Sequence, residues 1–130
     1  MNESAAAPLA IAGVSHHTAN VTALEDFRFR DEQELLKSAG QWFKGVLLLQ
    51  TCNRVELIVE GDADTLREFL TAQGRKDFFM HDGKGALSHL FSLASGIDSM
   101  IIGEDQIIGQ LKKSLADAQE SGTASPFLEF

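Results

Sequence analysis

A single cysteine, Cys52, is the residue in this chain best suited to covalent chemistry. It lies between two apolar runs of strand length, residues 46–50 and 55–60, and Asn53 and Arg54 follow it directly. A thiolate is the most nucleophilic ordinary side chain near neutral pH, and a neighbouring cation favours its formation. Arg54 is suited to that role, or to holding an anionic substrate group through a bidentate fork. The alternative is a buried cysteine that acts as a small hydrophobe beside an exposed arginine.

A histidine, His89, occurs in a segment whose apolar spacing predicts a helix over residues 84–95. It is offset from the apolar stripe, which places it at the edge of the core or beside a cleft. There it would serve as an acid, a base or a polarising donor near Cys52. The alternative is a histidine that is hydrogen-bonded at a helix surface.

Polar residues gather where two predicted helices meet, near residue 100. Ser99 and the first amides after Gly103 are suited to accepting the polar groups of a ligand. Ordinary capping of the two helices explains the same residues equally well. The cluster comprises Ser95, Asp98, Ser99, Glu104, Asp105 and Gln106.

Two other patterns do not predict a site. The segment Gly83-Lys84-Gly85 mimics a dinucleotide-binding loop, but Ser88 replaces its third glycine and no parallel βαβ repeat follows. We therefore expect no nicotinamide site and no metal site in this chain. The residues that invite a zinc hypothesis match no recognised ligand spacing: His16, His17, Cys52 and His81.

Composition limits the class of protein. A chain of 130 residues with 44% hydrophobic and 23% charged residues fits one globular domain with a real core. The net charge of −8, with basic residues scattered, argues against a stand-alone nucleic-acid binder. One cysteine cannot form an internal disulfide, which suits a reducing, cytoplasmic setting. No apolar run approaches the ~20 residues of a membrane-spanning helix, so we expect no membrane partner.

The apolar patterns predict an α+β fold. Strands are expected over residues 9–14, 46–50, 55–60 and 78–80. Helices are expected after Asp31, which begins a capping box with Glu34, and after Asp62 or Asp64. Gly45 and Gly74 would end these two helices. The order βαββαβ suits a small antiparallel, ferredoxin-like sheet with helices on one face.

A helical part follows the sheet. Its first helix carries Leu87, Leu90, Phe91 and Ala94 on one side, and a second helix is expected over residues 107–118. We predict one catalytic domain over residues 1–130, with a sheet part of about 1–82 and a helical part of about 83–130. Residues 127–130 begin an apolar segment that has no room to finish, so we expect a piece excised from a longer chain.

Three segments resemble the glutamyl-tRNA reductase family, in family order. Residues 13–19, Gly-Val-Ser-His-His-Thr-Ala, are similar to its opening G-[VLI]-[SN]-H-x-T-A. Residues 48–56, Leu-Leu-Gln-Thr-Cys-Asn-Arg-Val-Glu, resemble its catalytic stretch [ST]-T-C-N-R-[VT]-E. Residues 89–107 resemble its H-L-F-x-[VL]-[AT]-[SA]-G-L-[DE]-S-[ML]-[VI]-[VLI]-G-E-x-Q-I segment.

The resemblance implies an enzyme that reduces the glutamyl ester of tRNA(Glu) to glutamate-1-semialdehyde with NADPH, the first step of the C5 route to tetrapyrroles. It implies that Cys52 takes the glutamyl group as a thioester and that His89 assists at the reacting carbonyl. Arg54 and Ser99 would hold the glutamate moiety. The substrate-binding set carried over comprises Thr51, Asn53, Arg54, Ser99, Glu104 and Gln106.

The family's NADPH-binding domain and dimerisation helix would follow residue 130. The resemblance therefore implies that this fragment lacks the hydride-transfer step and is monomeric, and that the full-length protein is a homodimer. Asn20 departs from the proline usual at that position, which concerns the nearby loop and not Cys52. The alternative function is a regulatory or ligand-binding module that keeps the catalytic fold, and thiol reactivity would distinguish the two.

Overall fold

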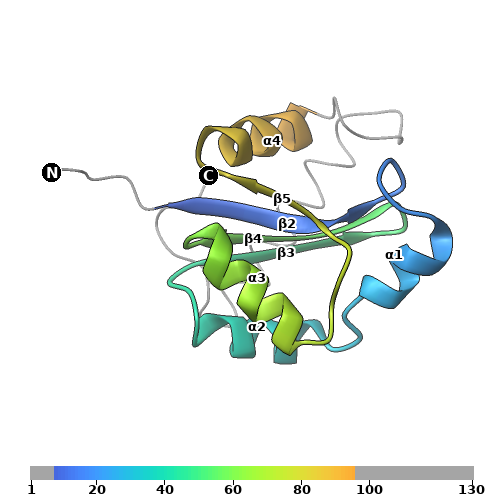
Figure 1. The fold of residues 1–130 in the computed structure, drawn as a ribbon, viewed down its shortest axis with the longest axis horizontal. Helices are drawn as coiled ribbons and strands as arrows, with labels where there is room; N and C mark the ends of the chain where they lie inside the picture. Colours follow the sequence, from blue (N-terminus) through green and yellow to red (C-terminus); the bar gives the residue numbers. More distant parts are fainter. Residues whose placement is uncertain (1–7, 96–130) are drawn as a thin grey trace, which may run out of the picture.

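A computed structural model of the chain describes residues 8–95 (Figure 1). Its elements are β2 (Leu9–Ser15), α1 (Val21–Phe27), α2 (Glu32–Gly40), β3 (Val46–Thr51), β4 (Arg54–Glu60), α3 (Ala63–Ala72), β5 (Phe79–Asp82) and α4 (Gly83–Ser95). The four strands form one sheet in the order β3-β4-β2-β5, and every neighbouring pair is antiparallel. The predicted α+β class and antiparallel sheet are confirmed. No helix among residues 8–95 is long and apolar enough to cross a membrane.

The topology is the predicted ferredoxin-like one. Strands β2 and β3 are joined through α1 and α2 and are separated in the sheet by β4. Strand β5 lies on the other side of β2, at the sheet edge. Figure 1 shows α2 and α3 below the sheet, whereas α4, the first helix of the predicted helical part, lies above it. The predicted helix over residues 107–118 lies outside the described residues.

Local capping explains where two of the helices begin and end. The Asp31 side chain accepts from the amide of Glu34 at 3.0 Å, and the Asp62 side chain accepts from the amide of Thr65 at 2.7 Å. Each carboxylate thus satisfies an amide that has no partner within the helix. Gly74 follows α3 with a φ of 77°, a conformation that glycine adopts without strain. The predicted cap Asp31 and the glycine after α3 are confirmed, and of the two candidates Asp62 and Asp64 the cap is Asp62.

Two predictions for the first part of the chain need correction. Helix α2 ends at Gly40 rather than at Gly45, and Phe43 is buried beyond its end. Helix α1 was not predicted, although Asn20 caps it by accepting from the amide of Ala23 at 2.8 Å. A helix of seven residues has too few turns to show a clear apolar period, which is why the pattern did not reveal it.

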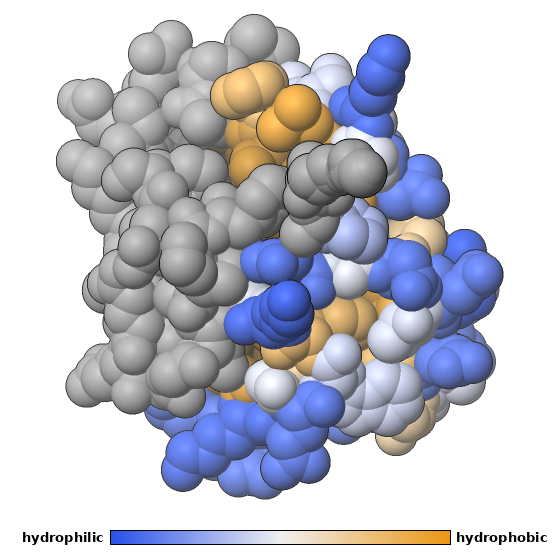
Figure 2. Space-filling view, turned by 90° about the vertical axis from the view of Figure 1, so that its left-hand side faces the viewer, coloured by the Kyte–Doolittle hydropathy of each residue, from blue (hydrophilic) through white to orange (hydrophobic). Residues whose placement is uncertain are grey.

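The predicted apolar stripe of α4 is only partly right, because Leu90 is buried but Leu87 and Phe91 are not. Among residues 83–93 the buried side chains of this helix are Ala86, Leu90 and Leu93, whereas Leu87 and Phe91 are 44% and 66% exposed. Figure 2 shows hydrophobic surface at the level of α4, at the top of the view. Burial of this stripe sets the rotation of the helix. His89 follows Ala86 by one turn and precedes Leu90, so it is directed toward the sheet.

The sheet face under α4 changes from apolar to polar along its strands. Leu9, Ile11, Leu47 and Ile58 form a small core with Ala86 and Leu90. Because alternate residues share a face, the polar residues further along the same strands lie on this side too. Successive pairs across β2 and β4 here are Ile11 with Ile58, Gly13 with Glu56, and Ser15 with Arg54. The apolar end therefore holds α4, and the polar end forms the floor of a site.

Gly13 is required by the close approach of two strands. A Cβ atom at this position would lie 2.1 Å from the carbonyl oxygen of Val55 and 2.8 Å from the Cα of Glu56. We expect Gly13→Ala to lower the free energy of unfolding by about 3 kcal/mol, because backbone atoms cannot move aside as a side chain can. Urea unfolding followed by circular dichroism measures this change.

Gly85→Ala is the matched control, because a Cβ there would meet no atom within 4 Å. Its position inside α4 should make alanine neutral or stabilising by about 0.5–1 kcal/mol. Equal unfolding midpoints for the two variants would contradict the role assigned to Gly13.

Candidate active site

Cys52 lies at the tip of a tight hairpin between β3 and β4. Thr51 pairs with Arg54, so Cys52 and Asn53 alone form the turn. The Asn53 amide donates to Thr51 Oγ1 at 3.1 Å, and the Asn53 carbonyl accepts from the amide of His16 at 2.9 Å. These bonds fix the turn on both sides and leave Cys52 exposed. The predicted placement of Cys52 between two strands is confirmed, and the alternative of a buried small hydrophobe is wrong.

A buried carboxylate, Glu56, joins Arg54 to His89. Glu56 is 0% exposed, and its Oε2 accepts from Arg54 Nη1 at 2.7 Å. Its Oε1 lies 2.6 Å from Nε2 of His89, a residue 33 positions later in the chain. Arg54 is itself 1% exposed, so the ion pair is withdrawn from water. A buried charge requires a partner of opposite sign, because removing an unpaired ion from water has a large free-energy cost.

The bond to Glu56 assigns the tautomer of His89. An ionised carboxylate accepts hydrogen bonds and donates none, so the proton at this contact belongs to Nε2 of the imidazole. The lone pair of a neutral ring is then on Nδ1. Glu56 therefore sets which ring nitrogen of His89 is the acceptor.

His89 is not a surface histidine with a local helix partner. Its side chain is 13% exposed, and its hydrogen-bond partner Glu56 comes from β4. Its ring also stacks on that of His81 from β5, with centroids 4.5 Å apart. The alternative interpretation from the sequence is therefore wrong. The structure brings His89 to the polar end of the sheet, where Arg54 begins β4.

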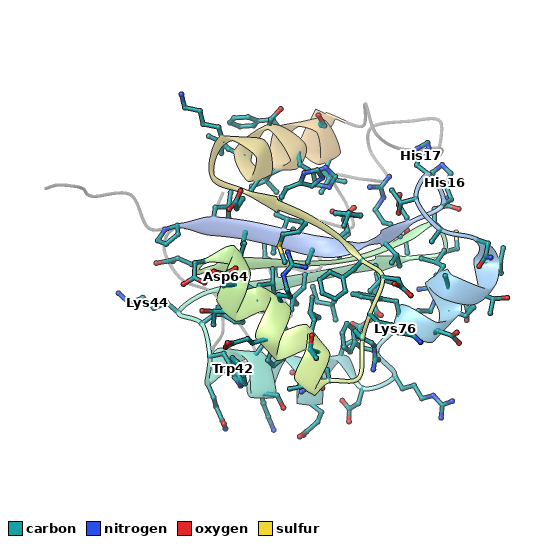
Figure 3. All side chains as sticks on the ribbon, in the orientation of Figure 1. His16, His17, Trp42, Lys44, Asp64 and Lys76 are labelled. Atoms are coloured by element: carbon teal, nitrogen blue, oxygen red, sulfur yellow. The ribbon has the colours of Figure 1, made fainter. Side chains whose placement is uncertain are left out.

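An open pocket of about 560 Å³ lies beside His89. One wall comes from the loop after β2, on which Figure 3 shows His16 and His17, and the others come from β5 and α4. Cys52 does not line this pocket, but the hydrogen bond from His16 to Asn53 ties its turn to the same loop. The lining residues are Ser15, His17, Thr18, Phe79, His81, Gly85, Ser88, His89 and Ser92.

The structure joins most of the predicted site and adds one residue to it. Thr51, Cys52, Asn53 and Arg54 form the hairpin, and His89 reaches it through Glu56. Sequence reasoning missed Glu56, although a charged residue two positions after Arg54 in an apolar strand shares its face. The predicted residues Ser99, Glu104 and Gln106 lie outside the described part of the chain.

The described residues offer no metal or dinucleotide site. No group of three His, Cys, Asp or Glu side chains among residues 8–95 is arranged to hold a metal ion. Gly83 and Gly85 follow β5, an edge strand antiparallel to its neighbour, and not the parallel βαβ unit that cradles a pyrophosphate.

Similarity to known proteins points to one family. The family model described as glutamyl-tRNA(Glu) reductase, N-terminal domain, matches residues 12–130. Glutamyl-tRNA reductase from Methanoregula boonei is 70% identical over 119 residues, which are 92% of this chain and 28% of that protein. Glutamyl-tRNA reductase from Methanospirillum hungatei is 52% identical over 128 residues, which are 98% of this chain and 30% of that protein.

A solved structure agrees with these relatives. Glutamyl-tRNA reductase from Methanopyrus kandleri superposes with a TM-score of 0.78 at 34% identity, covering 91% of this chain and 30% of that one. The chain thus spans 28–30% of the length of the relatives named here. It belongs to the glutamyl-tRNA reductase family and corresponds to the N-terminal domain of that family.

Proposed function

We propose that this chain is the catalytic domain of a glutamyl-tRNA reductase. The complete protein would convert glutamyl-tRNA(Glu) to glutamate-1-semialdehyde, the first step of C5 tetrapyrrole (porphyrin) biosynthesis, in the cytoplasm. The observation that carries the proposal is the exposed Cys52 at the tip of the hairpin. The second strand of this hairpin begins with Arg54, which is linked through Glu56 to His89. A thiol, and an imidazole oriented by a carboxylate, are the kinds of group that acyl transfer uses.

The chemical step proposed for these residues is thioester formation. The thiolate of Cys52 attacks the carbonyl carbon of the glutamyl ester, and a carbon–sulfur bond forms. The bond from that carbon to the ribose oxygen breaks, and the tRNA leaves with a proton on its ribose hydroxyl. We assign this proton transfer to His89: its Nδ1 takes the proton of the Cys52 thiol as the thiolate forms and gives it to the departing ribose oxygen, because Nε2 is committed to Glu56.

The reduction of the thioester requires a hydride donor, which we propose to be NADPH in the complete protein. The described residues do not fit this cofactor, since Gly83 and Gly85 lack the parallel strand and helix of a dinucleotide site. We therefore propose no hydride step for this chain alone. We also propose that the complete protein is a homodimer through residues beyond this chain and that the fragment is monomeric, which sedimentation analysis measures.

The test of the proposed function is deacylation of glutamyl-tRNA by this chain without NADPH. A thioester that receives no hydride should be lost to water, so we expect slow release of glutamate that depends on Cys52. A binding or regulatory module with the same fold has no need of the thiol. Deacylation no faster than with a chain alkylated at Cys52 would favour that alternative.

Arg54 is the residue we propose for recognition of the substrate's side-chain carboxylate. Its guanidinium has five N–H donors, of which Nη1 binds Glu56, and lysine cannot reproduce this planar fork. We expect Arg54→Lys to reduce the preference for glutamyl-tRNA over glutaminyl-tRNA by at least about 30-fold, since losing such a contact costs roughly 2–5 kcal/mol. The ratio of kcat/KM for the two substrates measures this preference.

The result distinguishes two roles for Arg54. A variant that loses stability but keeps the wild-type preference would show that Arg54 has a structural role and does not select the substrate. Lys37→Arg on the exposed side of α2 is the control for exchanging lysine and arginine. It should alter neither the stability nor the substrate preference.

A further inference from the structure

We propose that His81 is a positioning residue for His89, a role that rests on the proposed function. The two rings are stacked, with centroids 4.5 Å apart and planes 28° apart. His81 lies outside the three segments that resemble the family motifs, and no step of the proposed acyl transfer uses it. Its place in the fold follows from β5, where it pairs with Ile11 on the sheet face covered by α4.

A second ring contact is needed because a single hydrogen bond does not fix an imidazole. The bond from Nε2 to Glu56 places one ring nitrogen, but the ring can still tilt about that contact, and the torsion that turns a histidine ring has broad minima. The direction of Nδ1 depends on that tilt. A flat neighbour in van der Waals contact removes this freedom.

Phe79 is the third ring in contact with His89 and His81. Its ring centroid lies 5.4 Å from that of His89 and 5.2 Å from that of His81, so the three rings form one cluster. Phe79 and His81 alternate on one face of β5, and Phe79 pairs with Gly13, which carries no side chain to block His89. The cluster therefore holds His89 from β5 while Glu56 holds it from β4.

All three rings line the pocket of about 560 Å³ together with hydroxyl-bearing side chains. The tilt of His89 consequently decides where its Nδ1 points within that wall. Because a misplacement of about 1 Å can cost roughly 100-fold in rate, the stack is expected to affect the chemical step more than binding.

The test compares His81→Phe with His81→Leu in the complete protein. Phenylalanine keeps a flat ring, whereas leucine fills similar volume without one. We expect His81→Leu to lower the single-turnover rate of Cys52 acylation by about 10-fold to 100-fold, with KM changed less than about 3-fold. His81→Phe should recover most of the rate. Equal loss in both variants would overturn positioning in favour of an acid or base role for His81, and no loss in either would overturn it altogether.

A spectroscopic measurement separates positioning from general stability. Nitrogen-15 NMR of the imidazoles should show His89 protonated at Nε2 in the wild type and in His81→Leu, because Glu56 is unchanged, but with ring signals broadened by tilting in His81→Leu. A wild-type His89 protonated at Nδ1 would overturn the proposal, and His81→Ala replaces the leucine variant if that variant fails to fold. The outer face of α4 supplies a control, Leu87→Ala, which should change neither the rate nor the spectrum.

The controls distinguish this proposal from the proposed function. If the wild-type protein does not acylate Cys52, the function fails and His81 has no acyl transfer to assist. If the wild-type protein does acylate Cys52 while His81→Leu retains both the rate and the sharp ring signals of His89, only the positioning role fails.

Discussion

Replacement of Cys52 by serine is expected to lower the turnover of the complete protein by several orders of magnitude. A thiol ionises within reach of neutral pH, whereas a serine hydroxyl does not, so the variant lacks a nucleophile unless a base activates it. Cys52 is exposed at the tip of its turn, so the substitution creates no cavity and should leave the unfolding free energy within about 0.5 kcal/mol of wild type.

Steady-state reduction of glutamyl-tRNA, with unfolding measured in parallel, checks both expectations. The loss should lie in kcat, because substrate binding does not require the sulfur. Thr71→Ser, a small change on α3 away from the hairpin, is the control and should keep wild-type turnover. Reduction at a wild-type rate by Cys52→Ser would exclude the covalent mechanism.

Replacement of Glu56 by glutamine is expected to reduce both stability and acyl transfer. Arg54 and His89 each donate to one carboxylate oxygen, but an amide offers one oxygen and one NH₂ group. One donor must therefore face another donor, unless His89 moves its proton to Nδ1 and so loses the lone pair proposed to act there. We expect a loss of about 3 kcal/mol in unfolding free energy, because the buried arginine loses its ion pair with Glu56.

The same change should lower the single-turnover rate of Cys52 acylation by about 10²-fold or more, the range typical of a positioned acid or base. Glu68→Gln on the exposed side of α3 removes an equal charge and should alter neither quantity. A Glu56→Gln variant with wild-type acylation would show that the link from Arg54 to His89 is structural only.

The strands and caps could be predicted because their determinants are local. The apolar runs around Cys52 alternate with polar turn residues, and the side chains of Asp31 and Asp62 cap helices through amides three residues away. The turn that carries Cys52 needed no long-range information either. The ferredoxin-like order of strands in the sheet then followed from the βαββαβ order of elements along the chain.

The contacts of His89 could not be predicted in the same way. Two stripes on α4 fit a helical period, one through Leu87 and Phe91 and one through Ala86, Leu90 and Leu93, and only packing on the sheet decides between them. The choice of Glu56 as partner joins two elements 33 residues apart and depends on that packing. The burial of Arg54 depends on the same packing of α4 on the sheet. A charged residue in a short sequence motif gives no indication that it is buried.

The central claim is that Cys52 carries the glutamyl group, and intact-protein mass spectrometry tests it most directly. The chain would be incubated with glutamyl-tRNA without NADPH and quenched in acid, which preserves a thioester. We predict a species heavier by one glutamyl acyl group, located by peptide mapping on Cys52, released by hydroxylamine and absent from a Cys52→Ala chain. Release of tRNA with no such adduct at any time of quenching, or an adduct on another residue, would contradict the account.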